Sequence, residues 1–316
     1  MKRSDSNPQC PACDGRAFHA FCDTSFMNQD QRKLMECEGC GLTLLWPLPT
    51  PAELGAYYGP IYFGFGKASQ EGKGYAMARR LAKMASSGNF LDVGCATGFL
   101  LDGIRKNCDW KVYGVDYGAS AVRYCKEVLG LDARLGTLAA AKFKPASFDV
   151  IHLNNVIEHE LDPLALLKAS AKVLKPGGQI WLATPNGAVD RARYRDYLKG
   201  WGVRAESQDG HVFFFSGPSL ERLAAKAGLS VAGRWSSGMI RGARASGLLP
   251  RRMGWYRGFA PRDRSQQPKR PIEEFINEGK RYPKAYYVYK DLRDHATRLP
   301  GYWKAGFDFH LLLTKV

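Results

Sequence analysis

One stretch, residues 89–98, constrains the fold of this chain more than any other. It reads NFLDVGCATG, an apolar run typical of a buried parallel strand followed by a turn that contains Gly94 and Gly98. The next residues, 99–104, have the apolar spacing of a helix. A strand, a glycine turn and a helix in this order let the backbone approach a ligand while helix amides point at its polar end. The stretch therefore predicts a nucleotide-binding turn in an α/β sheet.

The spacing of the turn differs from that of a dinucleotide-binding turn. The dinucleotide fingerprint is G-x-G-x-x-G, whereas this chain has D-x-G-x-x-x-G, with Ala96 where the second glycine is needed. A second apolar segment, 111–115, ends in Asp116, about twenty residues after the turn, where an acid can hold both hydroxyls of a ribose. We therefore expect a ligand that contains a ribose, at a turn that suits a pyrophosphate poorly.

These residues resemble the class I S-adenosylmethionine (SAM) methyltransferases. The resemblance rests on 91–98 together with Asp116, and it continues through strand-like segments at 148–155 and 179–186. It runs from about residue 89 to about residue 228 and returns in the last ten residues. It implies SAM as the cofactor and a doubly wound α/β sheet of about seven strands. The alternative, a strand-helix turn of the same kind that binds nothing, becomes weaker with each later segment that fits.

The resemblance also assigns residues to the cofactor. Asp116 would hold the ribose, while Thr137 and Leu138, just after a third predicted strand at 131–135, would contact the adenine, although no acid stands there. The complete set that we expect at the cofactor is Asp92, Gly94, Cys95, Ala96, Thr97, Gly98, Asp116, Tyr117, Thr137, Leu138, Asn154 and Asn155.

Four of the eight cysteines form two C-x-x-C pairs, Cys10 with Cys13 and Cys37 with Cys40, separated by 23 residues. This spacing is close to that of a tetrahedral thiolate zinc site. Four cysteines would complete the coordination of the ion, so we expect a structural zinc rather than a catalytic one. Unpaired thiols or a redox pair are the alternatives.

Length and composition indicate a globular chain with one main domain and one or two small units, since 316 residues with 45% hydrophobic content can bury a sizeable core. The first eight residues lack the apolar region of a signal peptide, and no run of about eighteen apolar residues occurs. We therefore expect a cytoplasmic protein without a membrane span.

The proline-rich stretch 47–51 suggests the first domain boundary. The expected organisation is a zinc ribbon and connector over 1–50, a SAM-binding core over 51–238, a basic and aromatic insertion or lid over 239–304, and the last strand of the core over 305–316. An aromatic cluster at 57–63 follows the ribbon. A ribbon, such a cluster and a SAM domain in this order resemble methyltransferases of polysaccharide and natural-product pathways. There the tyrosines would help to close the cofactor pocket, but they could equally pack the ribbon against the core.

The candidate catalytic residues are His159, Glu158 and His211. Asn154 to His159 come at the carboxyl end of a predicted central strand, where ligands bind in open α/β sheets, and His211 lies in the connection after the next strand. Methyl transfer from a sulfonium needs an aligned acceptor and removal of its proton, a task that a histidine suits near neutral pH. His159 is the first candidate base, with Glu158 orienting it, and His211 the second. Either could instead only line the pocket or cap the next helix.

The pattern Asn155-x-x-Glu158-His159 with a later histidine also resembles an E-x-x-E-H plus histidine arrangement. It occurs in small-RNA 2'-O-methyltransferases and ubiquinone-pathway O-methyltransferases, where it is associated with a divalent ion. Such an ion could acidify an acceptor hydroxyl. Asn155 replaces the first glutamate, which removes one negative charge from this second metal site.

The formal net charge of the chain is +16, and about ten of these charges lie in the insertion at 239–304. There, arginines and lysines alternate with aromatic residues, from Arg251 and Trp255 to Tyr289. This mixture suits a phosphate-bearing partner such as a nucleotide sugar, a carrier-linked glycan, an anionic lipid surface or RNA. A solvated face of a lid or an oligomer contact would look similar.

Two classes of function remain open. The first is SAM-dependent transfer, most simply to an oxygen of a sugar, glycan or other small pathway metabolite, with His/Glu-assisted proton removal. The second is an RNA methyltransferase or RNA-binding protein that uses the basic insertion, which the sequence pI of about 9.5 favours. The sequence contains no recognisable RNA-binding module, which counts against the second.

Overall fold

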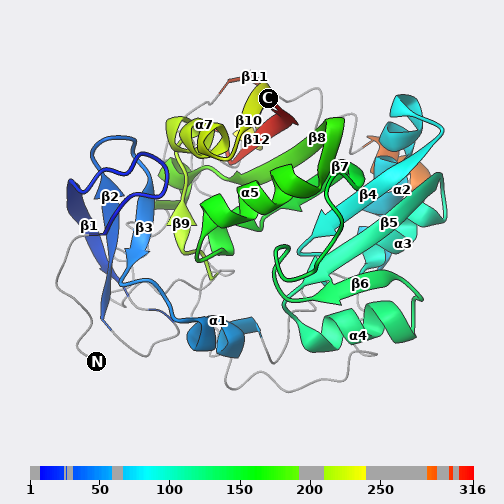
Figure 1. Cartoon of the computed structure of the whole chain (residues 1–316), viewed down its shortest axis with the longest axis horizontal. Helices are drawn as coiled ribbons and strands as arrows, with labels where there is room; N and C mark the ends of the chain where they lie inside the picture. The colour runs from blue at the N-terminus through cyan, green and yellow to red at the C-terminus, as the bar shows by residue number, and fades with distance from the viewer. Residues whose placement is uncertain are drawn as a thin grey trace.

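The computed structural model describes residues 8–24, 26, 31–58, 67–191, 210–239, 283–289, 299–301 and 306–316. Figure 1 shows a small sheet of N-terminal strands beside a larger twisted sheet that carries helices. The strands are β1 Phe18–Thr24, β2 Arg32–Cys37, β3 Thr43–Trp46, β4 Ser87–Val93, β5 Asp109–Asp116, β6 Asp132–Leu135, β7 Phe148–Asn154, β8 Leu174–Pro185, β9 Phe213–Phe214, β10 Leu229–Ser237, β11 Leu299–Pro300 and β12 Asp308–Lys315. The helices are α1 Pro51–Tyr58, α2 Lys67–Met84, α3 Phe99–Arg105, α4 Ala119–Glu127, the 3-10 turn η1 Ile157–His159, α5 Pro163–Val173 and α7 Gly217–Lys226.

The larger sheet has the order β11-β10-β12-β8-β7-β4-β5-β6. Strands β4 to β8 pair in parallel, and β12 inserts antiparallel between β8 and β10. The predicted doubly wound sheet of seven strands is confirmed. The two-residue β11 adds a short eighth strand at the edge beside β10. Because β4, β5 and β7 are parallel and adjacent, the turns after them lie at one edge of the sheet.

Neighbouring residues of the central strands point to opposite faces and build two separate cores. Leu91 and Ile151 pack in one apolar cluster with α5 and α7, whereas Phe90 and Val150 pack in another with α2, α3 and α4. The near-continuous apolar runs of β4 and β7 follow from this arrangement, since both faces of these strands are covered.

Local sequence signals explain the ends of several elements. The Asp162 side chain caps α5 by accepting a hydrogen bond from the amide of Ala165 at 2.8 Å, and Pro163 stands at the first helical position, a pair of signals that can be recognised in the sequence. The segment 175–178, which the sequence suggests is a tight turn, instead lies within β8. Phe148 of β7 pairs with Leu174 and Val150 pairs with Gln179, so residues 175–178 bulge between these two pairs, and Gly177 has a φ of 76°.

The N-terminal sheet has the order β1-β2-β3-β9, all antiparallel. Its fourth strand, β9, comes from beyond residue 210, and Figure 1 shows it beside β3 between the two sheets. Side chains of α7 also reach the ribbon: the Ser216 hydroxyl, which caps this helix, donates to the carbonyl oxygen of Cys40 at 2.6 Å, and Lys226 pairs with Asp14 at 2.8 Å. The boundaries predicted at residues 50, 238 and 304 stay predictions.

Of the predicted insertion at 239–304, the structure describes only short pieces. Helical residues 284–289 pack on α2, where a Cβ at Gly72 would lie 2.3 Å from the ring of Tyr287, and the Tyr287 hydroxyl donates to the Ala68 carbonyl oxygen at 2.9 Å. Most of the predicted basic and aromatic residues, from Arg251 to Arg270, lie outside the described residues, as do residues 59–63 of the aromatic cluster. Within the described part of the chain, no helix combines the length and apolar character needed to cross a membrane.

Candidate functional site

The glycine turn after β4 is tied to the end of β5. Both carboxylate oxygens of Asp116 accept hydrogen bonds from main-chain amides, one from Ala96 and one from Gly118, each at 2.7 Å. Gly94 also donates through its amide to the carbonyl oxygen of Val115 at 2.8 Å. Burial raises the pKa of Asp116, and the two amides oppose that rise. The turn and the acid therefore form one unit.

Glycine is required at two positions of this turn. Gly94 and Gly98 have φ angles of 76° and 73°, in the left-handed region that favours glycine. A Cβ on Gly94 would lie 2.7 Å from a methyl carbon of Val156, and one on Gly98 would lie 2.8 Å from the Cys125 sulfur. The spacing of the motif therefore reflects both backbone geometry and close packing.

The remaining cofactor candidates occupy different environments around this edge. Tyr117 is half exposed and its hydroxyl lies 3.3 Å from the carboxylate of Glu160, whose pKa burial raises to about 7. Leu138 is buried in the core, so only its main chain could face a ligand. Asn154 ends β7 and Asn155 follows it, and both are exposed. Their roles stay predictions.

Asp92 has a partner that the sequence did not suggest. Its carboxylate lies 2.8 Å from Nδ1 of His152, the residue opposite it on β7, and both side chains are largely buried. A cross-strand position appears only when the order and register of the strands are known.

The three candidate catalytic side chains come together from two elements far apart in sequence. Glu158 and His159 lie on η1, while His211 arrives on the segment that leads into β9. The His159 Nε2 lies 3.9 Å from Glu158 Oε1, and the two imidazole centroids are 4.9 Å apart. One nitrogen or oxygen of each residue lies within 4.8 Å of the others, so the set could share a divalent ion. Asn155 is exposed and its side chain is an amide, so no negative charge is available from that position.

The carboxyl of Glu158 has a raised pKa. Its side chain is fully buried, Oε2 accepts a hydrogen bond from the Thr184 hydroxyl at 2.9 Å, and Oε1 has no hydrogen-bond partner among the described residues. Burial raises the pKa of Glu158 to about 7, while the nearby His211 and the Thr184 hydrogen bond oppose the rise. A buried carboxyl in this range can exchange a proton near neutral pH.

Both histidines are held in the same way. Nδ1 of His159 lies 3.0 Å from the carbonyl oxygen of Gly210, and Nδ1 of His211 lies 2.7 Å from a carboxylate oxygen of Asp190. A carbonyl or an ionised carboxylate only accepts hydrogen bonds, so the hydrogen belongs on Nδ1 in each ring. The neutral imidazoles therefore carry their basic lone pair on Nε2.

Sequence reasoning missed Asp190. It lies in a short helical stretch, 187–191, shortly after β8. Its position shortly after the carboxyl end of β8 could have indicated it. The sequence predicts His159 and the glycine turn at this same edge of the sheet.

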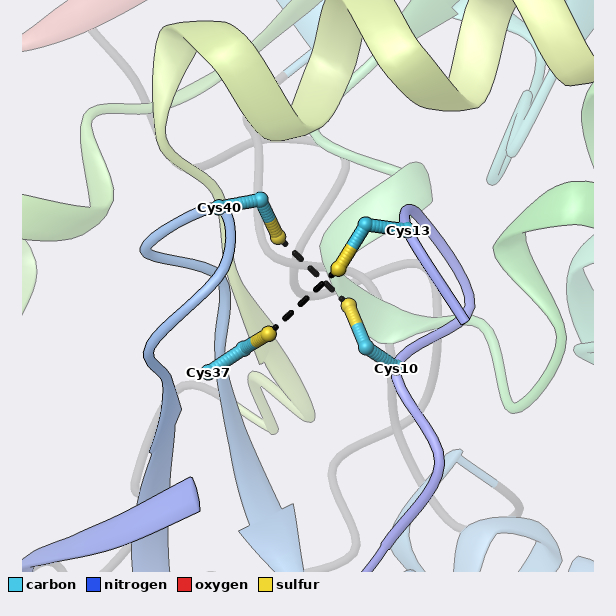
Figure 2. Close-up of side chains that lie close together, drawn as sticks. All are labelled: Cys10, Cys13, Cys37 and Cys40. Carbon is cyan, nitrogen blue, oxygen red and sulfur yellow. Dashed lines mark hydrogen bonds between the residues drawn. The ribbon is translucent and has the colours of Figure 1, made fainter. Parts of the chain in front are cut away.

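The four predicted zinc ligands also converge. Cys10 and Cys13 come from the loop before β1, Cys37 ends β2 and Cys40 lies in the turn after it. Figure 2 shows their sulfur atoms pointing toward one another. The Sγ–Sγ distance is 3.5 Å for Cys10–Cys40 and for Cys13–Cys37, and all four sulfurs lie within 4.8 Å. Tetrahedral zinc with Zn–S bonds of about 2.3 Å places sulfurs roughly 3.8 Å apart, so this donor set fits the ion.

Comparison with known proteins agrees with this geometry. The sequence matches the methyltransferase domain family over residues 70–232, just over half of the chain. The chain belongs to this family. The turn at 94–98 and Asp116 fall inside the matched range, and the domain is therefore a class I SAM-dependent methyltransferase domain.

Curated relatives of this chain include ubiquinone biosynthesis O-methyltransferases. That of Parvibaculum lavamentivorans is 32% identical over 122 residues, which are 35% of this chain and 47% of that protein. That of Idiomarina loihiensis is 31% identical over 149 residues, or 44% of this chain and 60% of that protein. The chain thus spans only about half the length of these relatives.

Among solved structures, a SAM-dependent methyltransferase from Thermotoga maritima, described as a possible histamine N-methyltransferase, is 16% identical. It has a TM-score of 0.46, and the match covers 80% of this chain and 91% of that one.

Proposed function

We propose that the methyltransferase transfers a methyl group from SAM to an oxygen of a sugar, glycan or other small pathway metabolite. The observation that carries this proposal is the convergence of Glu158, His159 and His211 at the sheet edge that also holds the glycine turn. O-methylation by the curated relatives supports transfer to oxygen.

The proposed cofactor site uses Asp116 for the ribose hydroxyls and the main chain at 94–98 for the methionine part. Each carboxylate oxygen of Asp116 already accepts one amide hydrogen bond and has a second lone pair for a hydroxyl. Thr137 and Leu138 would meet the adenine, with Tyr117, Asn154 and Asn155 around it. When bound, SAM supplies an electrophilic methyl group and leaves as a neutral thioether.

The chain's own residues would align the acceptor and take its proton. As the acceptor oxygen forms its bond to the methyl carbon and the sulfur–carbon bond breaks, the oxygen loses its proton to Nε2 of His159 or His211. Glu158, with a pKa of about 7, can support a positive imidazole beside it when ionised. Alignment of the acceptor oxygen with the methyl group at this edge of the sheet would further raise the rate of transfer.

We propose two metal sites, one structural and one catalytic. The sulfurs of Cys10, Cys13, Cys37 and Cys40 would hold a structural zinc with no open position. As the alternative to proton transfer to a histidine, Glu158, His159 and His211 would hold a divalent ion through the same Nε2 atoms, and the ion would acidify an acceptor hydroxyl. The buried Oε1 of Glu158, which has no hydrogen-bond partner among the described residues, supports the second site, whereas the missing carboxylate at Asn155 counts against it.

The acceptor is proposed to bear phosphate, because the insertion at 239–304 is strongly basic. The test is transfer from methyl-labelled SAM into a host extract that is then separated into small-metabolite, glycan-lipid, RNA and protein fractions, with and without added divalent ion. Label in the metabolite or glycan fraction supports the proposal, and dependence on the ion supports the second metal site. Label in RNA contradicts the small-acceptor proposal in favour of an RNA methyltransferase.

A further inference from the structure

We infer that Asp190 is a positioning residue for His211: its carboxylate holds the Nδ1–H of the imidazole and so directs the basic Nε2 toward the reacting oxygen. This inference rests on the proposed function, in which His211 is one of two candidate proton acceptors. Asp190 itself would touch neither the acceptor nor SAM.

The contact is short and lies inside the protein. Asp190 Oδ2 is 2.7 Å from His211 Nδ1, and the two residues are 3% and 7% exposed. A hydrogen bond to a charged acceptor in a dry environment is stronger than one at the surface, so this contact can fix the orientation of the ring.

The main chain at Asp190 is held by buried hydrogen bonds. The Asp190 amide donates to the Asn186 carbonyl oxygen at 2.9 Å, and the Asn186 side chain donates to the Gly306 carbonyl oxygen at 2.8 Å while accepting from the Ala188 amide at 3.1 Å. Asn186 is 1% exposed. The position of Asp190 is therefore set by the end of β8 and by the residue stretch before β12, not by His211.

Two neighbouring aromatic rings also confine the His211 ring. The His159 ring lies 4.9 Å away at 70° and the Phe214 ring 6.1 Å away at 67°. These contacts limit rotation of the imidazole, and the hydrogen bond to Asp190 selects which nitrogen faces the carboxylate. The backbone carbonyl of Gly210 has the same role for His159, so both rings present the same tautomer.

The experiment combines Asp190→Asn with ¹⁵N NMR of histidine-labelled protein, in which His211→Gln assigns the His211 signal. The wild type is expected to show His211 as the Nδ1–H tautomer. Asp190→Asn is expected to lose this preference and to lower kcat about 10- to 100-fold, the usual cost of removing such an orienting partner, with KM for SAM within about twofold. The control is Asp149→Asn, an acid paired with Lys175 at the amino end of β7, which should change neither the tautomer nor kcat.

An Nε2–H tautomer at His211 in the wild type would overturn the inference, and so would an Asp190→Asn variant with unchanged kcat. The wild-type tautomer is measured without any variant, so a failure of Asp190→Asn to fold leaves the inference open to refutation. The NMR measurement needs no acceptor, so it also separates this inference from the proposed function: a correct tautomer with label found only in RNA would retain the role of Asp190 and reject the small acceptor.

Discussion

The main-chain amide of Val212 donates a hydrogen bond to the carbonyl oxygen of Glu158 at 2.8 Å, which joins the segment carrying His211 to the turn carrying the other candidate catalytic residues. The carbonyl oxygen of Val212 accepts a second hydrogen bond, from the main-chain amide of Leu45 on β3 of the ribbon, at 2.9 Å. Val212 is fully buried. One peptide segment thus connects the cysteine ribbon with the candidate catalytic cluster.

We therefore expect loss of the ribbon metal to lower turnover without abolishing SAM binding. Cys10→Ser, or treatment with a chelator, should unfold the ribbon, because small zinc sites depend on their ion for folding. β3 would then no longer hold Val212, and turnover should fall about 10-fold or more, as when a supporting contact of an active-site group is lost. Cys22→Ser, a ribbon cysteine outside the cluster, is the control. Full turnover by metal-free protein with released zinc would contradict this coupling.

Asp116→Ala is expected to weaken SAM binding about 100-fold or more, since each hydrogen bond to a charged acceptor contributes roughly 1.5–3 kcal/mol. Titration calorimetry with SAM measures the change directly. Asp109→Ala, at the other end of β5 and exposed, should bind SAM like the wild type. Normal affinity in Asp116→Ala would show that the cofactor has been placed wrongly.

His159→Ala and His211→Ala are each expected to reduce turnover with little change in SAM affinity. Loss of the histidine that accepts the proton should lower turnover about 10²- to 10⁴-fold. Loss of the other histidine should lower turnover less. Single-turnover rates and equilibrium SAM binding separate the two effects. His19→Ala, on the exposed face of the ribbon, serves as the control. If either active-site variant loses SAM binding instead, that histidine contacts the cofactor.

Glu158→Gln is expected to change how stability depends on pH. Burial raises the pKa of Glu158 from about 4.5 to about 7, so the folded protein binds a proton that the unfolded chain releases between these values. The stability from this group is complete below pH 4.5 and is lost as the pH rises through 7. Urea unfolding at pH 5 and pH 8 should therefore show Glu158→Gln gaining stability relative to the wild type at the higher pH. Glu127→Gln, on the exposed surface of α4, should show no such change, and a parallel response of wild type and Glu158→Gln would contradict the assignment.

Much of the fold could be predicted from short stretches of sequence. The apolar run before Gly94, the helix cap at Asp162 and the paired C-x-x-C motifs each depend on residues within a few positions of one another. Such patterns set backbone conformation and side-chain periodicity locally, and the order of strands and helices then leaves few ways to build the sheet. The predicted sheet and the convergence of the four cysteines agree with the structure for this reason.

Other features could not be found in this way. β9 is only two residues long and pairs with a strand about 170 positions earlier. Two residues are too few to show the alternation of apolar and polar side chains that predicts a strand. Residues 175–178 form a bulge within β8, since pairing with β7 passes from Leu174 to Gln179 across them and Gly177 has a φ of 76°. Whether such a segment ends a strand or bulges within it depends on the register with the neighbouring strand.

The sequence by itself determined the glycine turn, the acid at Asp116 and the thiolate set, because each is defined by residue type and spacing along the chain. The tertiary structure alone decided that Asp190 contacts His211, that His152 contacts Asp92 and that the ribbon supports Val212. These contacts join residues from different elements, and their energies depend on burial and strand register, which arise only when the two sheets and their helices are packed together.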